Sequence, residues 1–96
     1  MKVVVGYPPN IEAIRAVFPV KGRSDVLFCY GDTVYSPGGE HRVDRLMRAH
    51  ESVHIGQQLQ DGPETWWKWY LEDPEFRLSQ ELSAHKAEYS AFCDAK

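Results

Sequence analysis

Two breaks that contain proline divide the second half of this 96-residue chain into three predicted helices. Gly62-Pro63 interrupts a helical pattern that begins at about residue 41, because glycine ends helices and proline cannot continue them. Asp73-Pro74 is a typical helix start, with a capping residue before a proline at the first helical position. The sequence therefore predicts a helix to residue 61, a short aromatic helix over 64–71 and a long last helix.

The first half of the chain carries shorter signals. β-Branched residues predict a strand over 2–5, and two further strands, over 26–30 and Thr33–Tyr35, are expected to form a hairpin. A helix with Asn10 as its N-cap is expected between the first strand and the hairpin. This order predicts an α+β fold with a small, mostly antiparallel sheet, and the length allows one domain, over residues 1–96.

Composition argues against several classes of function. The net charge is −3 and the eleven lysines and arginines are scattered, which is unlike a nucleic-acid-binding surface. No apolar run approaches the roughly 20 residues of a membrane span, and Val3-Val4-Val5 is too short for a signal peptide, so a cytoplasmic protein is expected. Cys29 and Cys93 are therefore expected to be free and buried.

The helix before Gly62 carries His50-Glu51-Ser52-Val53-His54, an HExxH pattern. Residues four apart on a helix point to nearly the same side, so both imidazoles can reach one zinc ion. Glu51 lies about 100° round the helix from His50, where its carboxylate can take a proton from a water bound to the metal. Catalytic zinc usually takes three protein ligands, and Glu81 on the last helix is the candidate third.

Alternatives remain open for these residues. The two histidines can instead be hydrogen-bonded core residues, or a metal can stabilise the fold without catalysis. Glu88 lies seven residues after Glu81, on the same side of the helix, and is a second candidate ligand. Gln57 and Gln58 can orient a ligand through hydrogen bonds.

Two apolar features complete the pattern. The tryptophans at 66, 67 and 69 are expected to form a core between the last two helices, and a stripe along the last helix is expected to face that core. The stripe consists of Leu78, Leu82, His85, Tyr89 and Phe92. The strand over 26–30 supplies an edge that can hold an extended peptide by backbone pairing.

The HExxH segment to Gln57, the tryptophan-rich stretch and Glu81-Leu82-Ser83-Ala84-His85 together resemble the gluzincin branch of zinc metallopeptidases. The likeness is greatest to the small stand-alone forms, the minigluzincins, and to short HExxH proteins of tailed phages, and it covers roughly residues 26–89. It implies a zincin-like fold, with zinc held by His50, His54 and Glu81 and with Glu51 as general base.

The resemblance also implies a zinc-dependent peptidase acting on a peptide or protein, without nucleic acid or membrane as partner. Such sequences often have an aromatic residue, commonly Tyr, where this chain has His85. Either His85 or Tyr89 is then expected to stabilise the oxyanion, or His85 to bind the metal. If a phage encodes the chain, it is expected in the host cytoplasm or the virion.

A second hypothesis comes from another class of protein. The chain can be a binding, structural or regulatory module with a zincin fold, in which the metal only stabilises the structure. A second copy of the chain or a phage protein would then be its partner. Because 96 residues can build only a shallow cleft, the length favours a metal more strongly than it favours a peptidase.

Overall fold

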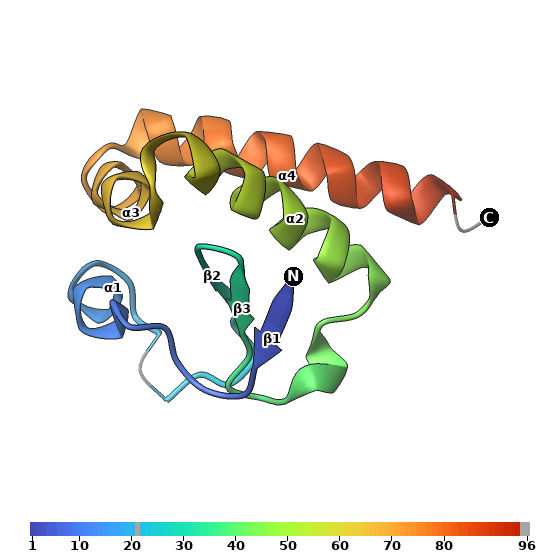
Figure 1. The fold of residues 1–96 in the computed structure, drawn as a ribbon, viewed down its shortest axis with the longest axis horizontal. Helices are drawn as coiled ribbons and strands as arrows, with labels where there is room; N and C mark the ends of the chain where they lie inside the picture. The colour runs from blue at the N-terminus through green and yellow to red at the C-terminus, as the bar shows by residue number, and fades with distance from the viewer. Residues whose placement is uncertain (21, 95–96) are drawn as a thin grey trace.

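A computed structural model describes residues 1–20 and 22–94. Its elements are β1 (Lys2–Val4), α1 (Ile11–Val17), β2 (Phe28–Tyr30), β3 (Thr33–Tyr35), the 3-10 turn η1 (Glu40–Arg42), α2 (Arg45–Asp61), α3 (Pro63–Glu72) and α4 (Pro74–Asp94). The predicted α+β class is confirmed. The two long helices α2 and α4 lie side by side, and the small sheet and α1 lie on the other side of α2 from α4 (Figure 1).

The three-stranded sheet is mixed. Its strand order is β1-β3-β2, in which β3 pairs antiparallel with β2 and parallel with β1. The predicted mostly antiparallel sheet is therefore wrong. A tight turn at Gly31 forces β2 and β3 to run in opposite directions, whereas the connection through α1 is long enough for a parallel pair. Strand β2 is left at the edge that faces the helices.

Capping residues define where two of the helices begin. The Asp44 carboxylate accepts a hydrogen bond from the Met47 N–H at 2.9 Å, so α2 begins at Arg45, somewhat later than predicted. Asp73 accepts from the N–H groups of Glu75 and Phe76, which confirms the predicted start of α4. Asn10 stands before α1 as expected, but its side chain makes no capping hydrogen bond.

The apolar core lies between α1, β2 and α3. Its buried members come from these elements and the segment after α1: Ile14, Val20, Phe28, Trp66 and Trp67. Trp69 is 41% exposed, so the predicted tryptophan core is correct for two of the three residues.

The apolar stripe predicted for α4 does not face the core. Leu78, Leu82 and Tyr89 are all at least half exposed. The side of α4 that packs on α2 instead carries Ala84, which is fully buried, with Glu81 on the preceding turn and its carboxylate directed at α2. Helix α4 therefore approaches α2 through a small residue and acidic groups.

Gln58 joins α2 to the β2–β3 hairpin. Its side chain is 1% exposed; the carbonyl oxygen accepts from the Gly31 N–H at 2.7 Å and the amide donates to the Cys29 carbonyl at 2.9 Å. Trp67 of α3 donates to the same Cys29 carbonyl at 2.9 Å. Helices α2 and α3 are thus both anchored to the edge strand.

We expect Gln58→Ala to lower the free energy of unfolding by about 2–4 kcal/mol, because it removes two hydrogen bonds and leaves a cavity. Urea denaturation measures this loss. Gln60→Ala, at an exposed position on the same helix, is the matched control and should change stability by less than about 0.5 kcal/mol. Equal urea midpoints for the two variants would contradict the role given to Gln58.

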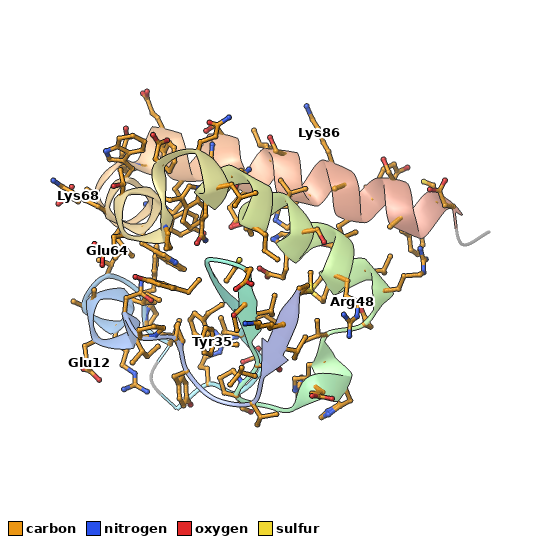
Figure 2. The ribbon with its side chains drawn as sticks, viewed as in Figure 1. Glu12, Tyr35, Arg48, Glu64, Lys68 and Lys86 are labelled. Atoms are coloured by element: carbon orange, nitrogen blue, oxygen red, sulfur yellow. The ribbon has the colours of Figure 1, made fainter. Side chains whose placement is uncertain are left out.

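The surface carries charges of both signs. Figure 2 shows Glu12, Lys68 and Lys86 pointing away from the body of the molecule, while Glu64, also exposed, lies between α3 and α1. None of the helices in residues 1–20 and 22–94 is long and apolar enough to cross a membrane. Both cysteines are free; Cys29 is buried as predicted, whereas Cys93 is exposed and that part of the prediction is wrong.

Candidate metal centre

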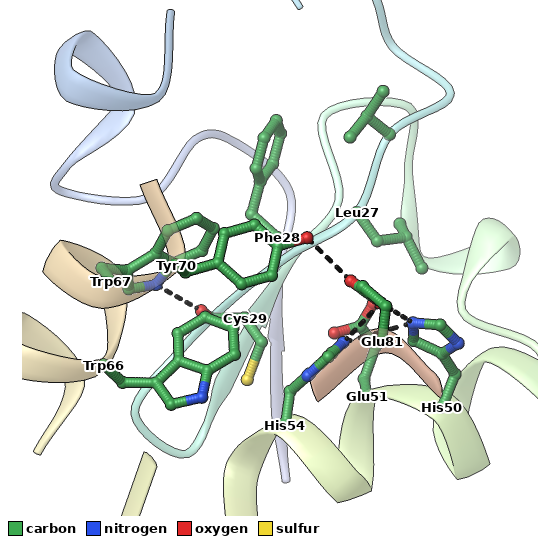
Figure 3. A pocket seen from close by; sticks show the side chains of 11 residues that line it. Leu27, Phe28, Cys29, His50, Glu51, His54, Trp66, Trp67, Tyr70 and Glu81 are labelled. Atoms are coloured by element: carbon green, nitrogen blue, oxygen red, sulfur yellow. Dashed lines mark hydrogen bonds and ion pairs between the residues drawn. The ribbon is translucent and has the colours of Figure 1, made fainter. Parts of the chain in front are cut away.

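His50 and His54, one turn apart on α2, meet Glu81 of α4 at a single point (Figure 3). The Nε2 atoms of His50 and His54 lie 3.1 and 3.0 Å from Glu81 Oε1. The two Nε2 atoms lie 3.3 Å from each other. Both histidines are more than nine-tenths buried. The three predicted ligands are therefore brought together.

Each imidazole is also held through its other nitrogen. His50 Nδ1 lies 2.9 Å from a Glu88 carboxylate oxygen, and His54 Nδ1 lies 2.8 Å from the Gln57 side-chain oxygen. The Gln57 amide nitrogen donates to the Gln80 carbonyl at 3.2 Å, which fixes the orientation of that amide. An acceptor opposite each Nδ1 requires an N–H there, so a neutral imidazole carries its lone pair on Nε2.

While both imidazoles are neutral, the three central atoms are all acceptors, and acceptors this close need a proton or a metal ion between them. Zinc bonds of about 2.0–2.2 Å at tetrahedral angles place ligand atoms about 3.3–3.5 Å apart. The observed separations of 3.0, 3.1 and 3.3 Å are close to that spacing. The donor set and its geometry therefore fit a metal ion.

The charges of the cluster shift the pKa of its members. Burial by itself raises the pKa of Glu81, but hydrogen bonds with His50 and His54 outweigh it and hold that pKa far below its usual range. Burial alone would lower the pKa of both histidines, yet the contact with Glu81 raises it. Glu81 is thus an anion that attracts a proton or a metal to the imidazoles.

Glu51 lies in the same centre but is not one of the three candidate ligands, His50, His54 and Glu81. It is 5% exposed, and burial raises its pKa, with Glu81 and Glu88 adding to the rise and the two histidines opposing it. It lines a cavity of about 210 Å³ together with the ligand residues, the edge strand and aromatic residues of α3. Glu51 therefore shares this cavity with the three candidate ligands.

Tyr70 was missed by sequence reasoning. Its hydroxyl donates to Glu81 Oε2 at 2.8 Å, while its ring stacks on Trp66 with centroids 4.8 Å apart. The i, i+4 spacing from Trp66 was the available signal, because it places Tyr70 on the buried side of α3. The aromatic run predicted that Tyr70 packs in the core, and it gave no indication that the hydroxyl contacts Glu81.

Both predicted helpers, His85 and Tyr89, are exposed residues of α4. The His85 ring lies 4.8 Å from the His50 ring, and His50, Glu81 and His85 form a group whose ligand atoms lie within 4.8 Å of one another. This group can also hold a metal ion, although the His85 side chain is 65% exposed. Tyr89 is 68% exposed. His85 and Tyr89 both line a pocket other than the one that contains Glu51.

Strand β2 borders the cavity, but part of its edge is already used. Cys29 is paired with Val34 in the hairpin, and its carbonyl points away from β3 toward Gln58 and Trp67. That carbonyl accepts from both Gln58 and Trp67, which occupies both lone pairs. Pairing of a peptide with this edge is therefore restricted to the residues before Cys29.

Comparison with protein-family models, with curated proteins and with solved structures finds no match for this chain.

Proposed function

We propose that this chain is a zinc-dependent peptidase of minimal gluzincin type, with His50, His54 and Glu81 as zinc ligands and Glu51 as general base. The observation that carries the proposal is the meeting of three acceptor atoms within 3.3 Å of one another. The nitrogens that could donate are engaged elsewhere, by Glu88 and Gln57.

The ligand types favour zinc over other common ions. Calcium and magnesium prefer sites built from oxygen atoms alone, whereas two imidazoles and a carboxylate are a ligand set of catalytic zinc. Three protein ligands also leave one coordination position for water or substrate, which is typical of hydrolytic sites.

A bound zinc ion supplies Lewis-acid polarisation of a carbonyl and makes water more acidic. Glu51 takes the proton of the attacking water and returns it to the leaving amine, and its raised pKa suits both steps. Glu88 and Gln57 hold the imidazoles with Nε2 directed inward, and Tyr70 holds Glu81. Of the two candidate helpers for the oxyanion, His85 is favoured because it lies beside His50.

Profiling of a mixed peptide library by mass spectrometry tests this proposal. The zinc-loaded protein should generate new peptide termini, and both a chelator and Glu51→Gln should abolish them. A library that stays uncut by the zinc-loaded protein would contradict the proposed peptidase.

A metal-stabilised module without catalysis is the second candidate, and the position of His85 favours it. A fourth protein ligand would close the site, as in structural zinc centres, and His85 belongs to a metal-binding group with His50 and Glu81. Stoichiometric zinc and a raised melting temperature, with no cleavage in wild type or in His85→Ala, would favour this function.

We expect Tyr70→Phe to weaken zinc affinity about tenfold, because Glu81 loses the hydroxyl that orients it. Competition with a fluorescent zinc chelator measures the change. Tyr35→Phe removes a hydroxyl on β3 and serves as the matched control, with unchanged affinity expected. Equal affinities in the two variants would contradict a positioning role for Tyr70.

A further inference from the structure

An apolar pocket of about 280 Å³ adjoins the metal centre. It lies between α1, β2 and α3, with Ile14 and Phe18 on one side and Arg77 of α4 among its lining residues. It shares part of its wall with the cavity that holds Glu51, through Leu27 and Tyr70 among others. A molecule whose reacting bond lies at Glu51 can therefore extend into this pocket.

Arg77 is the charged residue that lines this pocket. Its guanidinium donates one hydrogen bond to the Tyr70 carbonyl at 2.8 Å and stacks over the Phe18 ring, 5.0 Å from its centroid. Within residues 1–20 and 22–94, Arg77 forms no ion pair with a carboxylate. A guanidinium has five N–H donors, so several remain for a ligand, in a fork that matches a carboxylate.

Tyr70 connects the two sites. Its hydroxyl contacts Glu81 at 2.8 Å, and its ring centroid lies 5.9 Å from the Arg77 guanidinium carbon. The Tyr70 ring thus spans the separation between the metal centre and the Arg77 guanidinium. Two or three residues of extended peptide, at about 3.5 Å each, cover such a distance.

We infer that this pocket binds the C-terminal residue of a peptide, with a large apolar side chain in the pocket and the α-carboxylate on Arg77. The inference rests on the proposed peptidase function and assigns its substrate class. In a C-terminal residue, the α-carboxylate and the side chain are attached to the same Cα, so they can contact Arg77 and the adjoining apolar pocket at the same time. An acidic side chain on the adjacent residue of an extended peptide would point to the opposite side.

Calorimetric titration of zinc-loaded Glu51→Gln protein tests the inference, because this variant is expected to bind peptide without cutting it. The ligands are acetyl-alanyl-phenylalanine, its C-terminal amide, acetyl-alanyl-glycine, and acetyl-phenylalanyl-glutamic acid amide, in which only the side chain is acidic. We expect the phenylalanine acid to bind about 10- to 100-fold more tightly than its amide and than the other two ligands.

A second substitution separates Arg77 from the metal, which can itself bind carboxylates. In Glu51→Gln/Arg77→Gln the acid and the amide should bind equally weakly, whereas Glu51→Gln/Arg45→Gln, altered at an exposed position on α2, should keep the preference. The inference would be overturned if the preference for the phenylalanine acid over its amide survived Arg77→Gln. It would also be overturned if acetyl-phenylalanyl-glutamic acid amide bound more tightly than the phenylalanine acid, or if none of the four ligands bound. Zinc content and cleavage by the wild type report on the proposed function separately.

Discussion

Removal of zinc is expected to lower the melting temperature of this chain by about 15–30 °C. Zinc at a thousand times its dissociation constant stabilises the native state by about 4 kcal/mol, and each kcal/mol is worth about 4–8 °C in a domain of this size. The structural reason lies in how α2 and α4 meet. Their interface carries the two histidines with Glu81 and Glu88, and Ala84 is the buried residue of α4.

Without a cation, this interface places acceptor atoms against one another in a buried position. Protonation of the histidines relieves part of the repulsion between these acceptor atoms, and a bound metal should relieve it more completely. Thermal melts followed by circular dichroism, with zinc and with excess chelator, measure the shift.

Substitutions assign the effect to the site. His54→Ala should abolish both bound zinc and the zinc-dependent shift. His41→Ala, at an exposed residue of η1 outside the site, should retain both. A wild-type protein that is purified without zinc, takes none up and melts at the same temperature with chelator would contradict the metal centre.

The second large effect is expected for Glu51→Gln, which should lower kcat for peptide cleavage by a factor of about 10²–10⁴. Glutamine has the same shape but cannot accept the proton of the attacking water. Zinc content should be unchanged, because Glu51 lies outside the triangle formed by His50, His54 and Glu81. Cleavage of a fluorogenic peptide chosen from the library, with elemental analysis of the same samples, measures both quantities.

Glu64→Gln is the matched control, since Glu64 is an exposed residue in the first turn of α3. It should retain full activity and full zinc content. Equal activity in Glu51→Gln and the wild type would refute the mechanism, and loss of zinc from Glu51→Gln would reassign Glu51 as a ligand.

The elements of the fold were largely predictable, because their signals are local. The Gly62-Pro63 break and the Asp73 cap mark helix ends through the backbone of a few neighbouring residues. The direction of β1 relative to β3 was not predictable in this way. It depends on how the chain returns through α1, which no short pattern specifies.

The exposed stripe of α4 shows the limit of periodicity. A period of 3.6 residues identifies which side chains share a helix face, but it does not state which face is buried. Here the apolar face, with Leu78 and Leu82, lies outside. The face with Glu81 packs on α2, and its carboxylate meets the histidines there.

The HExxH spacing was enough to predict that His50 and His54 lie on one side of a helix with Glu51 beside them, since this follows from the geometry of a single α-helix. How the two acids of α4 meet these histidines becomes visible only in the tertiary structure. Glu81 meets both Nε2 atoms and Glu88 holds His50 through Nδ1. That arrangement depends on the relative rotation and offset of α2 and α4, which packing across the whole interface determines.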